Sequence, residues 1–409
     1  MVTFSRDPGF EYRARVLRRI RVGTMFSRLA TLLALAALGC ACSDTGTGLL
    51  LRQDTPDVWS GEVWVLSDPG TREETPHETD DGWPVDAGAP DRDTGREDAG
   101  PPPPIRFLSD QQVLPALLDL IAQASTSLDL VQLEFLAGFI PDQIQSALLA
   151  AAARGVVVRV LLEKDVDDNA SRVPTLLAGG VQARLDGSSK TLHTKLVVAD
   201  GHRVLVGSTN LSTSSLKYNH EANFLFEEDS IGAAFAEYAN GLWVSDGALE
   251  SLPPALSGQV AGIGDAQYLE RVRPLLSSAS RRVLVVLYQL DPDDQDSDSL
   301  LQALFDARSR GADVRVLLES SAFADDVNAA NQKAASRLVA GGIPVRFDSK
   351  DVVTHAKLVV CDDRVVVYSG NWVGSALRRN HEAGAIVDSV PIAEEAAGYF
   401  EQRWAEGTP

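Results

Sequence analysis

The stretch of sequence that decides the fold runs from Leu192 to Ser212 and reads LHTKLVVADGHRVLVGSTNLS. A second stretch, from Thr354 to Gly374, repeats it as THAKLVVCDDRVVVYSGNWVG. In both, an apolar run, a polar turn and another apolar run predict two strands joined by a tight turn. A histidine and a lysine two residues apart open each first strand, and such side chains point the same way. The sequence therefore predicts a duplicated chain with a duplicated polar site.

The duplication extends over residues 105–250 and 251–409. Each copy begins with a helix that has one apolar face, followed by an apolar strand, SLDLVQLEF in the first copy and RRVLVVLYQL in the second. Another helix ends at an Arg-Gly pair, and a buried strand follows, VVVRVLLE or ADVRVLLE. This alternation predicts an α/β fold made of two similar α/β sandwich repeats, each a mixed sheet flanked by helices. A pseudo-twofold axis would relate them and place the active site at their interface.

Each copy carries the same polar residue types in the same order. The first copy has His193, Lys195, Asp200, Ser208, Asn210 and Glu221. The second copy has His355, Lys357, Asp362, Ser369, Asn371 and Glu382. The glutamate belongs to an Asn-His-Glu-Ala segment that also occurs once in each copy. One HxKxxxxD pattern can arise by accident, but two copies with the same following elements indicate shared chemistry.

This pattern resembles that of the phospholipase D superfamily over residues 105–409, closest in outline to bacterial phospholipase D-like and cardiolipin synthase-like proteins. The resemblance implies cleavage or exchange of a phosphodiester through a covalent phosphohistidine. It also implies that His193, in the N-terminal copy, attacks phosphorus, and that His355 serves as acid and base. No metal and no cofactor is required by this scheme.

Phosphodiester chemistry explains the residue types. The substrate is anionic, so catalysis needs cations and N–H donors around its free oxygens, an in-line nucleophile and an acid for the leaving alkoxide. Lys195 and Lys357 supply charge, and Asn210 and Asn371 supply donors. Two serines and two glutamates support them, with each glutamate expected to accept a hydrogen bond from a histidine Nδ1–H. Asp200 and Asp362, seven residues beyond the histidines, are interpreted as structural residues of the strand-to-strand turn.

The second copy departs from the first at one motif position, because Tyr368 stands where Gly207 stands in the first copy. We expect this change to narrow the pocket or to add a phenol to it. His202 follows Gly201 in a turn and is interpreted as a solvated surface residue. Cys361 lies in an apolar run and is interpreted as a small buried hydrophobe.

Three other features favour structural readings. His220 and His381, in the repeated Asn-His-Glu-Ala segments, are expected to pack that segment, the alternative being a supporting role behind the catalytic residues. The acidic run DPDDQDSDS from Asp291 lacks the glycine and the final glutamate of an EF-hand, so it predicts an acidic helix cap. Trp243 and Trp404 are expected in the core, not at a substrate platform.

The N-terminal residues 1–42 predict a secretion leader. MFSRLATLLALAALGCACS has an arginine, a short apolar run and a lipobox-like ending at Cys40, the expected lipidation site. A plain signal cleaved near the same place is the alternative, and either Met1 or Met25 is the start. Residues 43–104 are rich in Asp, Glu, Pro and Gly and predict a disordered acidic tether.

Charge narrows the choice of substrate. The chain carries a net charge of −20, of which residues 105–409 contribute −14, and an acidic body binds nucleic acid poorly. The first hypothesis is therefore a phospholipase D that hydrolyses or transphosphatidylates phospholipid at a membrane surface. The second is a nuclease or other phosphodiesterase with the same chemistry, and the third is a non-catalytic lipid-binding lipoprotein. We expect a monomer that is lipid-anchored in the cell envelope, on the periplasmic or outer side, or secreted.

Overall fold

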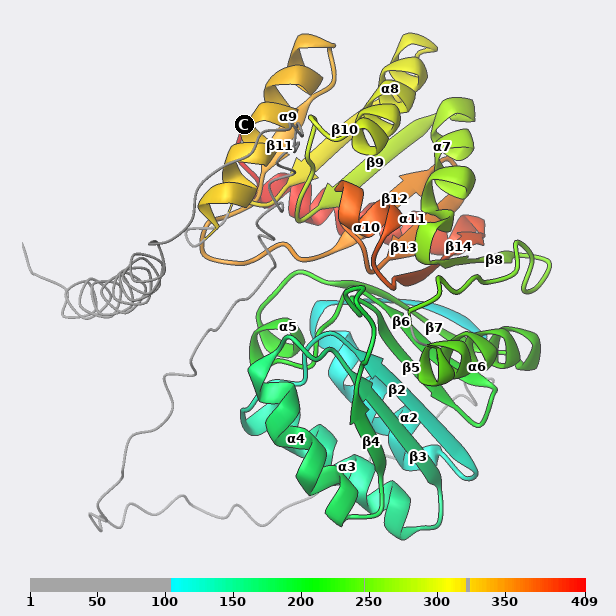
Figure 1. The fold of residues 1–409 in the computed structure, drawn as a ribbon. Coiled ribbons are helices and arrows are strands. Elements are labelled where there is room, and N and C mark those ends of the chain that lie inside the picture. Colours follow the sequence, from blue (N-terminus) through cyan, green and yellow to red (C-terminus); the bar gives the residue numbers. More distant parts are fainter. Residues whose placement is uncertain (1–103, 246, 321–323) are drawn as a thin grey trace, which may run out of the picture. The chain divides into compact units, whose positions relative to one another are not determined.

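The computed structural model describes residues 104–245, 247–320 and 324–409 (Figure 1). The leader at 1–42, its Cys40 and all but the last residue of the 43–104 tether lie outside these residues. Predictions for those segments stay predictions. Within the described residues, each copy forms one seven-stranded mixed sheet with helices, which confirms the predicted fold class.

The first sheet has the strand order β1-β7-β6-β5-β2-β3-β4. The last three strands of this order, β2, β3 and β4, are parallel to one another, and the other pairs are antiparallel. Helices connect the parallel strands, as the apolar runs predicted. The strands are β1 (Ile105–Ser109), β2 (Ser127–Gln132), β3 (Val157–Leu162), β4 (Gln182–Leu185), β5 (Lys195–Ala199), β6 (Arg203–Gly207) and β7 (Ala222–Glu227). The helices are α2 (Val113–Gln123), α3 (Phe139–Ala153), α4 (Asp167–Ala178), α5 (Thr213–Lys217) and α6 (Asp229–Val244).

The second sheet repeats this arrangement strand for strand, in the order β8-β14-β13-β12-β9-β10-β11. Its parallel strands are β9, β10 and β11. The strands are β8 (Val260–Gly264), β9 (Arg282–Leu287), β10 (Asp313–Leu318), β11 (Val345–Phe347), β12 (Lys357–Cys361), β13 (Arg364–Tyr368) and β14 (Ala383–Asp388). The helices are α7 (Tyr268–Ser278), α8 (Gln295–Ser309), α9 (Asp325–Ala340), α10 (Gly374–Arg378) and α11 (Val390–Glu406).

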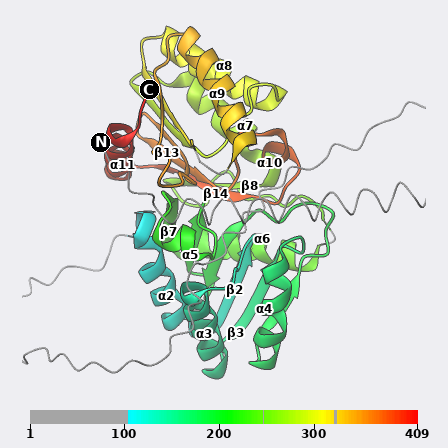
Figure 2. The same ribbon diagram turned by 90° about the vertical axis from the view of Figure 1, so that its left-hand side faces the viewer.

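One hydrophobic core is shared by the two copies. Buried side chains of both sheets, among them Phe224, Phe226, Val365 and Val367, form one contiguous cluster with residues of α6 and α11. Strands β6 and β7 contact β13 and β14 where the copies meet, and α11 also contacts β1 of the first copy (Figure 2). Each copy has a second core on its other face. Because the shared core draws on both copies, neither copy can bury its apolar surface alone.

The structure overturns the expectation for Tyr368, whose phenol does not enter an active-site pocket. Its ring is buried in the outer core of the second copy, 4.7 Å from the ring of Tyr268, and its hydroxyl donates to Asp265 O at 2.6 Å. The cross-strand partner of Tyr368 is Gly384, whereas the partner of Gly207 is Asn223. In the first copy the glycine lies on β6 and the larger residue on β7, whereas in the second copy the larger residue lies on β13 and the glycine on β14. Each pair therefore still combines a glycine with a larger residue.

This exchange predicts a strong requirement for glycine at position 384. A Cβ there would lie 2.2 Å from Val367 O and 2.7 Å from Tyr368 Cα, both backbone atoms that cannot move aside. Gly384→Ala is therefore expected to lower the free energy of unfolding by roughly 3 kcal/mol, measured by urea denaturation. Gly398→Ala is the matched control, because nothing lies within 4 Å of its added Cβ in the helix α11. The control should gain roughly 0.5–1 kcal/mol, and equal losses in both variants would contradict the steric explanation.

The two repeated tryptophans pack against the shared core and are held by arginines. The guanidinium groups of Arg159 and Arg184 lie 5.5 Å and 5.0 Å from the ring centroid of Trp243, a distance typical of cation–π contact. The second copy repeats the arrangement with Trp404, Arg315 and Arg346. Both rings are partly buried and pack the last turns of α6 and α11 against the shared core, whereas the sequence predicted them inside the core.

The acidic run after Asp291 caps a helix. Asp294 Oδ1 accepts hydrogen bonds from the backbone N–H groups of Asp296 and Ser297, both at 3.0 Å, at the first turn of α8. This is the contact expected of an N-cap aspartate. None of the helices in the described part of the chain is both long and apolar enough to span a bilayer.

Candidate active site

The two histidines stand two residues before the first residues of the strands β5 and β12. The residues His193 and His355 are each 6% exposed, and the lysines two residues later are buried too. Lys195 Nζ donates to His193 O, and Lys357 Nζ donates to His355 O, both at 2.8 Å. Each lysine therefore holds the main chain of its own histidine and places a positive charge beside it.

Each histidine is bonded to the glutamate of the other copy. His193 Nδ1 lies 2.9 Å from Glu382 Oε2, and His355 Nδ1 lies 3.1 Å from Glu221 Oε1. Both carboxylates are fully buried. A carboxylate at Nδ1 places the proton there and leaves Nε2 as the reactive nitrogen. The sequence predicted a glutamate partner for each histidine but not that the partners would cross between the copies.

The crossing is built by the main chain. Short parallel bridges pair Leu192 with His381, and Thr354 with His220. His193 N donates to His381 O, and His355 N donates to His220 O, both at 2.9 Å. Each Asn-His-Glu-Ala segment thus lies along the residues that lead into β5 or β12 of the other copy, here called the catalytic strands. The glutamate of the segment reaches the histidine at that place.

The rings of His220 and His381 are buried beneath this crossing. His381 Nδ1 lies 2.8 Å from Asp265 Oδ2. His220 of the first copy is held by two residues of the second copy. Arg403 Nη1 lies 2.8 Å from His220 Nδ1, and Asp348 Oδ2 lies 3.6 Å from His220 Nε2. Both rings therefore pack the segment, as expected, while the main-chain carbonyls of the same residues support the catalytic histidines.

Two aspartates that the sequence analysis did not place in the site fix the glutamates. Asp110 accepts from Glu221 N at 2.9 Å, and Asp265 accepts from Glu382 N at 3.0 Å. Both aspartates adopt a positive φ, and each accepts a hydrogen bond from a tyrosine of the opposite copy. These hydroxyls are Tyr399 Oη on Asp110, at 3.0 Å, and Tyr238 Oη on Asp265, at 2.7 Å. A signal was present in the sequence, since both copies have Asp-x-Gln directly before their first helix.

The serines hold the glutamates, and the asparagines lie beside them. Ser208 Oγ donates to Glu221, and Ser369 Oγ donates to Glu382, within their own copies. The structure therefore brings each serine to a glutamate of its own copy. The second polar pair, Asn210 and Asn371, is buried two residues beyond the serines. Serine, glutamate and histidine thus form one hydrogen-bonded chain on each side of the site.

Asp200 and Asp362 lie at the opposite ends of the catalytic strands, in the turns. Asp200 has a φ of +55° and accepts from the N–H groups of Ser125, Thr126 and Ser127 at 2.9, 2.7 and 3.0 Å. Asp362 does the same in the second copy, with Ser280, Arg281 and Arg282. Burial opposes the charge, but the backbone N–H donors outweigh it and lower the pKa of both carboxyls. These contacts tie the turn to the start of the neighbouring strand.

These contacts predict a loss of stability on removal of the Asp200 charge. Asp200→Asn keeps the size and tolerates a positive φ but offers one acceptor oxygen, so the free energy of unfolding should fall by about 1–3 kcal/mol at pH 7. Because folding lowers this pKa, the contribution is complete above the unfolded value of about 3.9 and disappears as the pH falls further. Urea unfolding of wild type and variant at pH 7 and at pH 3 measures the loss of stability and its dependence on pH. An equal difference between wild type and variant at the two pH values would contradict the charged role.

A buried glutamate supports the residue before each histidine. Glu163 Oε2 accepts from Leu192 N, and Glu319 Oε2 accepts from Thr354 N, both at 2.5 Å. Burial, reinforced by the neighbouring Asp348, raises the pKa of Glu319 to about 8. In the first copy, Lys164 Nζ lies 3.7 Å from Glu163. These glutamates end the repeated run VRVLLE, which was the signal for them in the sequence.

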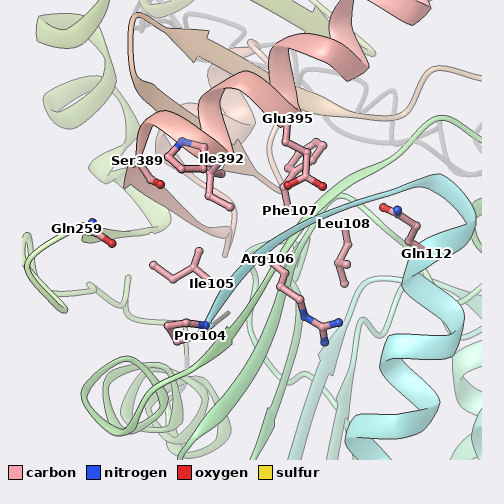
Figure 3. A pocket seen from close by; sticks show the side chains of 11 residues that line it. Pro104, Ile105, Arg106, Phe107, Leu108, Gln112, Gln259, Ser389, Ile392 and Glu395 are labelled. Carbon is pink, nitrogen blue, oxygen red and sulfur yellow. The ribbon is translucent and has the colours of Figure 1, made fainter. Parts of the chain in front are cut away.

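The open pocket in Figure 3 lies along the edge strand β1 and the start of α11, and neither His193 nor His355 is among its lining residues. It has a volume of about 500 Å³. Its lining comes from both copies and comprises Pro104, Ile105, Arg106, Phe107, Leu108, Gln112, Gln259, Ser389, Pro391, Ile392 and Glu395. In the ranges that the structure describes, no three His, Cys, Asp or Glu side chains are grouped as metal ligands.

A family profile described as "Cardiolipin synthase, PLD-like domain" matches residues 117–243 and, again, residues 272–404. Mitochondrial cardiolipin hydrolase of Xenopus tropicalis is 32% identical over 128 residues, which make up 31% of this chain and 59% of that protein. Cardiolipin synthase B of Escherichia coli (strain K12) is 29% identical over 135 residues, 32% of each protein. The matched part therefore spans less than two thirds of the length of these relatives.

Among solved structures, phosphatidylserine synthase of Haemophilus influenzae Rd KW20 superposes with a TM-score of 0.59 and 14% identity. The superposition covers 73% of this chain and 85% of that one. Polyphosphate kinase of Porphyromonas gingivalis superposes with a TM-score of 0.53 and 15% identity, covering 73% of this chain and 50% of that one. At such identities the likeness concerns the fold, which these proteins share over both copies.

Proposed function

The chain belongs to the phospholipase D-like family typified by cardiolipin synthase, and from that premise we propose that it is a phosphodiesterase that hydrolyses or transphosphatidylates phospholipids. The observation that carries the proposal is the pair of crossed contacts, His193 with Glu382 and His355 with Glu221. They give the chain two oriented imidazoles, which is what a double displacement at phosphorus requires.

In the proposed first step, His193 Nε2 attacks phosphorus. The bond between phosphorus and the leaving oxygen breaks, and protonated His355 gives its Nε2 proton to the leaving alkoxide. In the second step, water or an alcohol attacks the phosphohistidine while His355 takes up its proton, and the phosphorus–nitrogen bond breaks. Each histidine carries positive charge at one stage, and the buried carboxylate at its Nδ1 stabilises that charge.

The lysines and asparagines bind the substrate in this scheme. Lys195 and Lys357 place two positive charges beside the histidines, where the non-bridging oxygens of the phosphodiester would lie. The amides of Asn210 and Asn371 supply oriented donors from the ends of β6 and β13. No residue of this set requires a metal or a cofactor.

A phospholipid is the proposed substrate because two observations favour it over nucleic acid. The relatives named above are, by their names, a cardiolipin hydrolase and a cardiolipin synthase, and the body of the chain is acidic, which disfavours a polyanion. The same proposal includes lipidation at Cys40 and a place at the envelope surface, because both would bring the site to a bilayer. It also includes a monomeric state. A nuclease of the same family is the second candidate, because the chemistry at phosphorus is identical.

The test offers both substrates to one preparation of the full chain. Vesicles with labelled cardiolipin, phosphatidylglycerol or phosphatidylcholine are incubated with and without butanol, and single-stranded DNA is incubated in parallel. We expect phosphatidic acid or phosphatidylbutanol from at least one lipid, and no product from the His193→Asn variant. DNA cleavage without lipid turnover would overturn the lipid assignment. Folded protein that binds vesicles and forms neither product would favour the non-catalytic lipoprotein.

A further inference from the structure

The two histidines differ in an aromatic neighbour. Tyr288 follows β9 and is buried, with 2% of its surface exposed. Its ring centroid lies 5.4 Å from that of His355, and the two rings meet edge to face at 66°. The ammonium group of Lys357 lies 5.3 Å from the same centroid. One aromatic ring therefore adjoins two groups of the site.

The first copy has Leu133 at the matching place. Register shows the equivalence, because Gln132 pairs with Lys195 at the end of β2, just as Leu287 pairs with Lys357 at the end of β9. The residue that comes next in the chain is leucine in one copy and tyrosine in the other. A leucine side chain has no π face, so only the second copy offers a ring at this position.

We propose that Tyr288 determines which histidine is the acid, by stabilising the protonated form of His355. This inference rests on the proposed function, which needs one protonated and one neutral histidine. The face of an aromatic ring attracts cations, and the attraction grows when water is excluded. Tyr288 is a positioning residue in this scheme: it acts through His355 and touches no reacting atom of the substrate.

Most of the charged groups near the two histidines are matched between the copies. His355 faces Glu221 from the other copy and Lys357 on its own strand, and Thr354 beside it is bonded to Glu319 and Asp348. The positions that match these around the first histidine hold Glu382, Lys195, Glu163 and Asp186. Two charges differ. Lys164 lies beside Glu163 where the second copy has Ser320, and Arg403 lies beside His220 where the first copy has Leu242 at the matching place in α6.

The kinetic test compares Tyr288→Leu, which copies the first repeat, with Tyr288→Phe, which keeps the ring. The alkaline limb of the kcat/KM profile reports loss of the acid's proton. We expect Tyr288→Leu to move this limb down by about one pH unit, with up to a tenfold loss of kcat/KM at pH 8. Tyr288→Phe should keep the wild-type limb. Tyr218→Leu, at a tyrosine that is 60% exposed, controls for the same chemical change elsewhere.

A second measurement does not depend on activity. The titration of the His355 ring is followed by NMR of isotope-labelled histidine in the full chain, with the signal assigned from a His355→Asn variant. We expect the His355 ring to lose its proton at a pH about one unit lower in Tyr288→Leu than in the wild type or in Tyr288→Phe. Where Tyr288→Leu does not fold, phenylalanine carrying one to three fluorines at position 288 keeps the shape and weakens the ring face stepwise. The midpoint pH of the His355 titration should then fall with each added fluorine.

The two proposals fail in different ways. A His355 titration that is the same with leucine, phenylalanine or fluorinated rings at position 288 overturns the role of Tyr288, whatever the enzyme turns over. Absence of turnover on every phosphodiester overturns the proposed function, and the NMR titration still reports whether the ring holds the proton.

Discussion

His193→Asn and His355→Asn are each expected to lower kcat by at least about 10⁴-fold, but to stop the reaction at different steps. A nitrophenyl phosphodiester shows the difference, because nitrophenolate leaves without the help of an acid. His355→Asn should still form the phosphohistidine on His193 and release one equivalent of nitrophenol in a burst. The intermediate then accumulates, because no base activates water. His193→Asn should show no burst, since the nucleophile is gone.

The measurement is rapid-mixing absorbance, followed by an acid quench that detects phosphorus bound to histidine. His202→Asn is the control, because its ring is 46% exposed and bonded to Asp229 at the surface; it should behave as wild type. A burst in His193→Asn and none in His355→Asn would reverse the assignment of nucleophile and acid.

Glu382→Gln and Glu221→Gln are expected to reduce kcat by about 10²–10⁴-fold, and the crossed contacts predict which step each one slows. Glu382 bonds to His193, so its loss should slow the burst. Glu221 bonds to His355, so its loss should leave the burst and slow the steady phase. Glutamine keeps the size of both side chains but cannot balance an imidazolium charge.

The same rapid-mixing experiment separates this arrangement from pairing within a copy. Pairing within a copy predicts the opposite result, with Glu221→Gln slowing the burst. Both glutamates are fully buried, so thermal unfolding of each variant is recorded alongside. Equal unfolding temperatures would assign the kinetic difference to charge balance and not to a damaged fold.

Much of the fold followed from local patterns in the sequence. Runs such as KLVVA and RVLVG are short, apolar and bounded by a turn, and they became β5 and β6. The tight turn between them needs a residue with positive φ, and aspartate meets that need at Asp200 and Asp362. The candidate site was also visible, because each of its residue types occurs twice at nearly the same spacing.

The crossing of the glutamates was not accessible from the sequence. Within a copy, Glu221 is 28 residues from His193, and nothing in the spacing tells whether it reaches that histidine or His355. The answer depends on how the Asn-His-Glu-Ala segments pair with the catalytic strands across the shared core. Tyr368 was misjudged for a similar reason. The Tyr368 side chain has room because Gly384, its partner on the neighbouring strand, has no side chain. The motif around Tyr368 does not reveal this pairing.

The crossed contacts also affect how the two copies can change over generations. After a duplication, one copy is usually free to accumulate substitutions while the other keeps the activity. Here a substitution at Glu382 harms the histidine of the first copy, and one at Glu221 harms the histidine of the second. Selection therefore acts on both copies at once, and substitutions that compensate for each other should occur between the copies more often than within one.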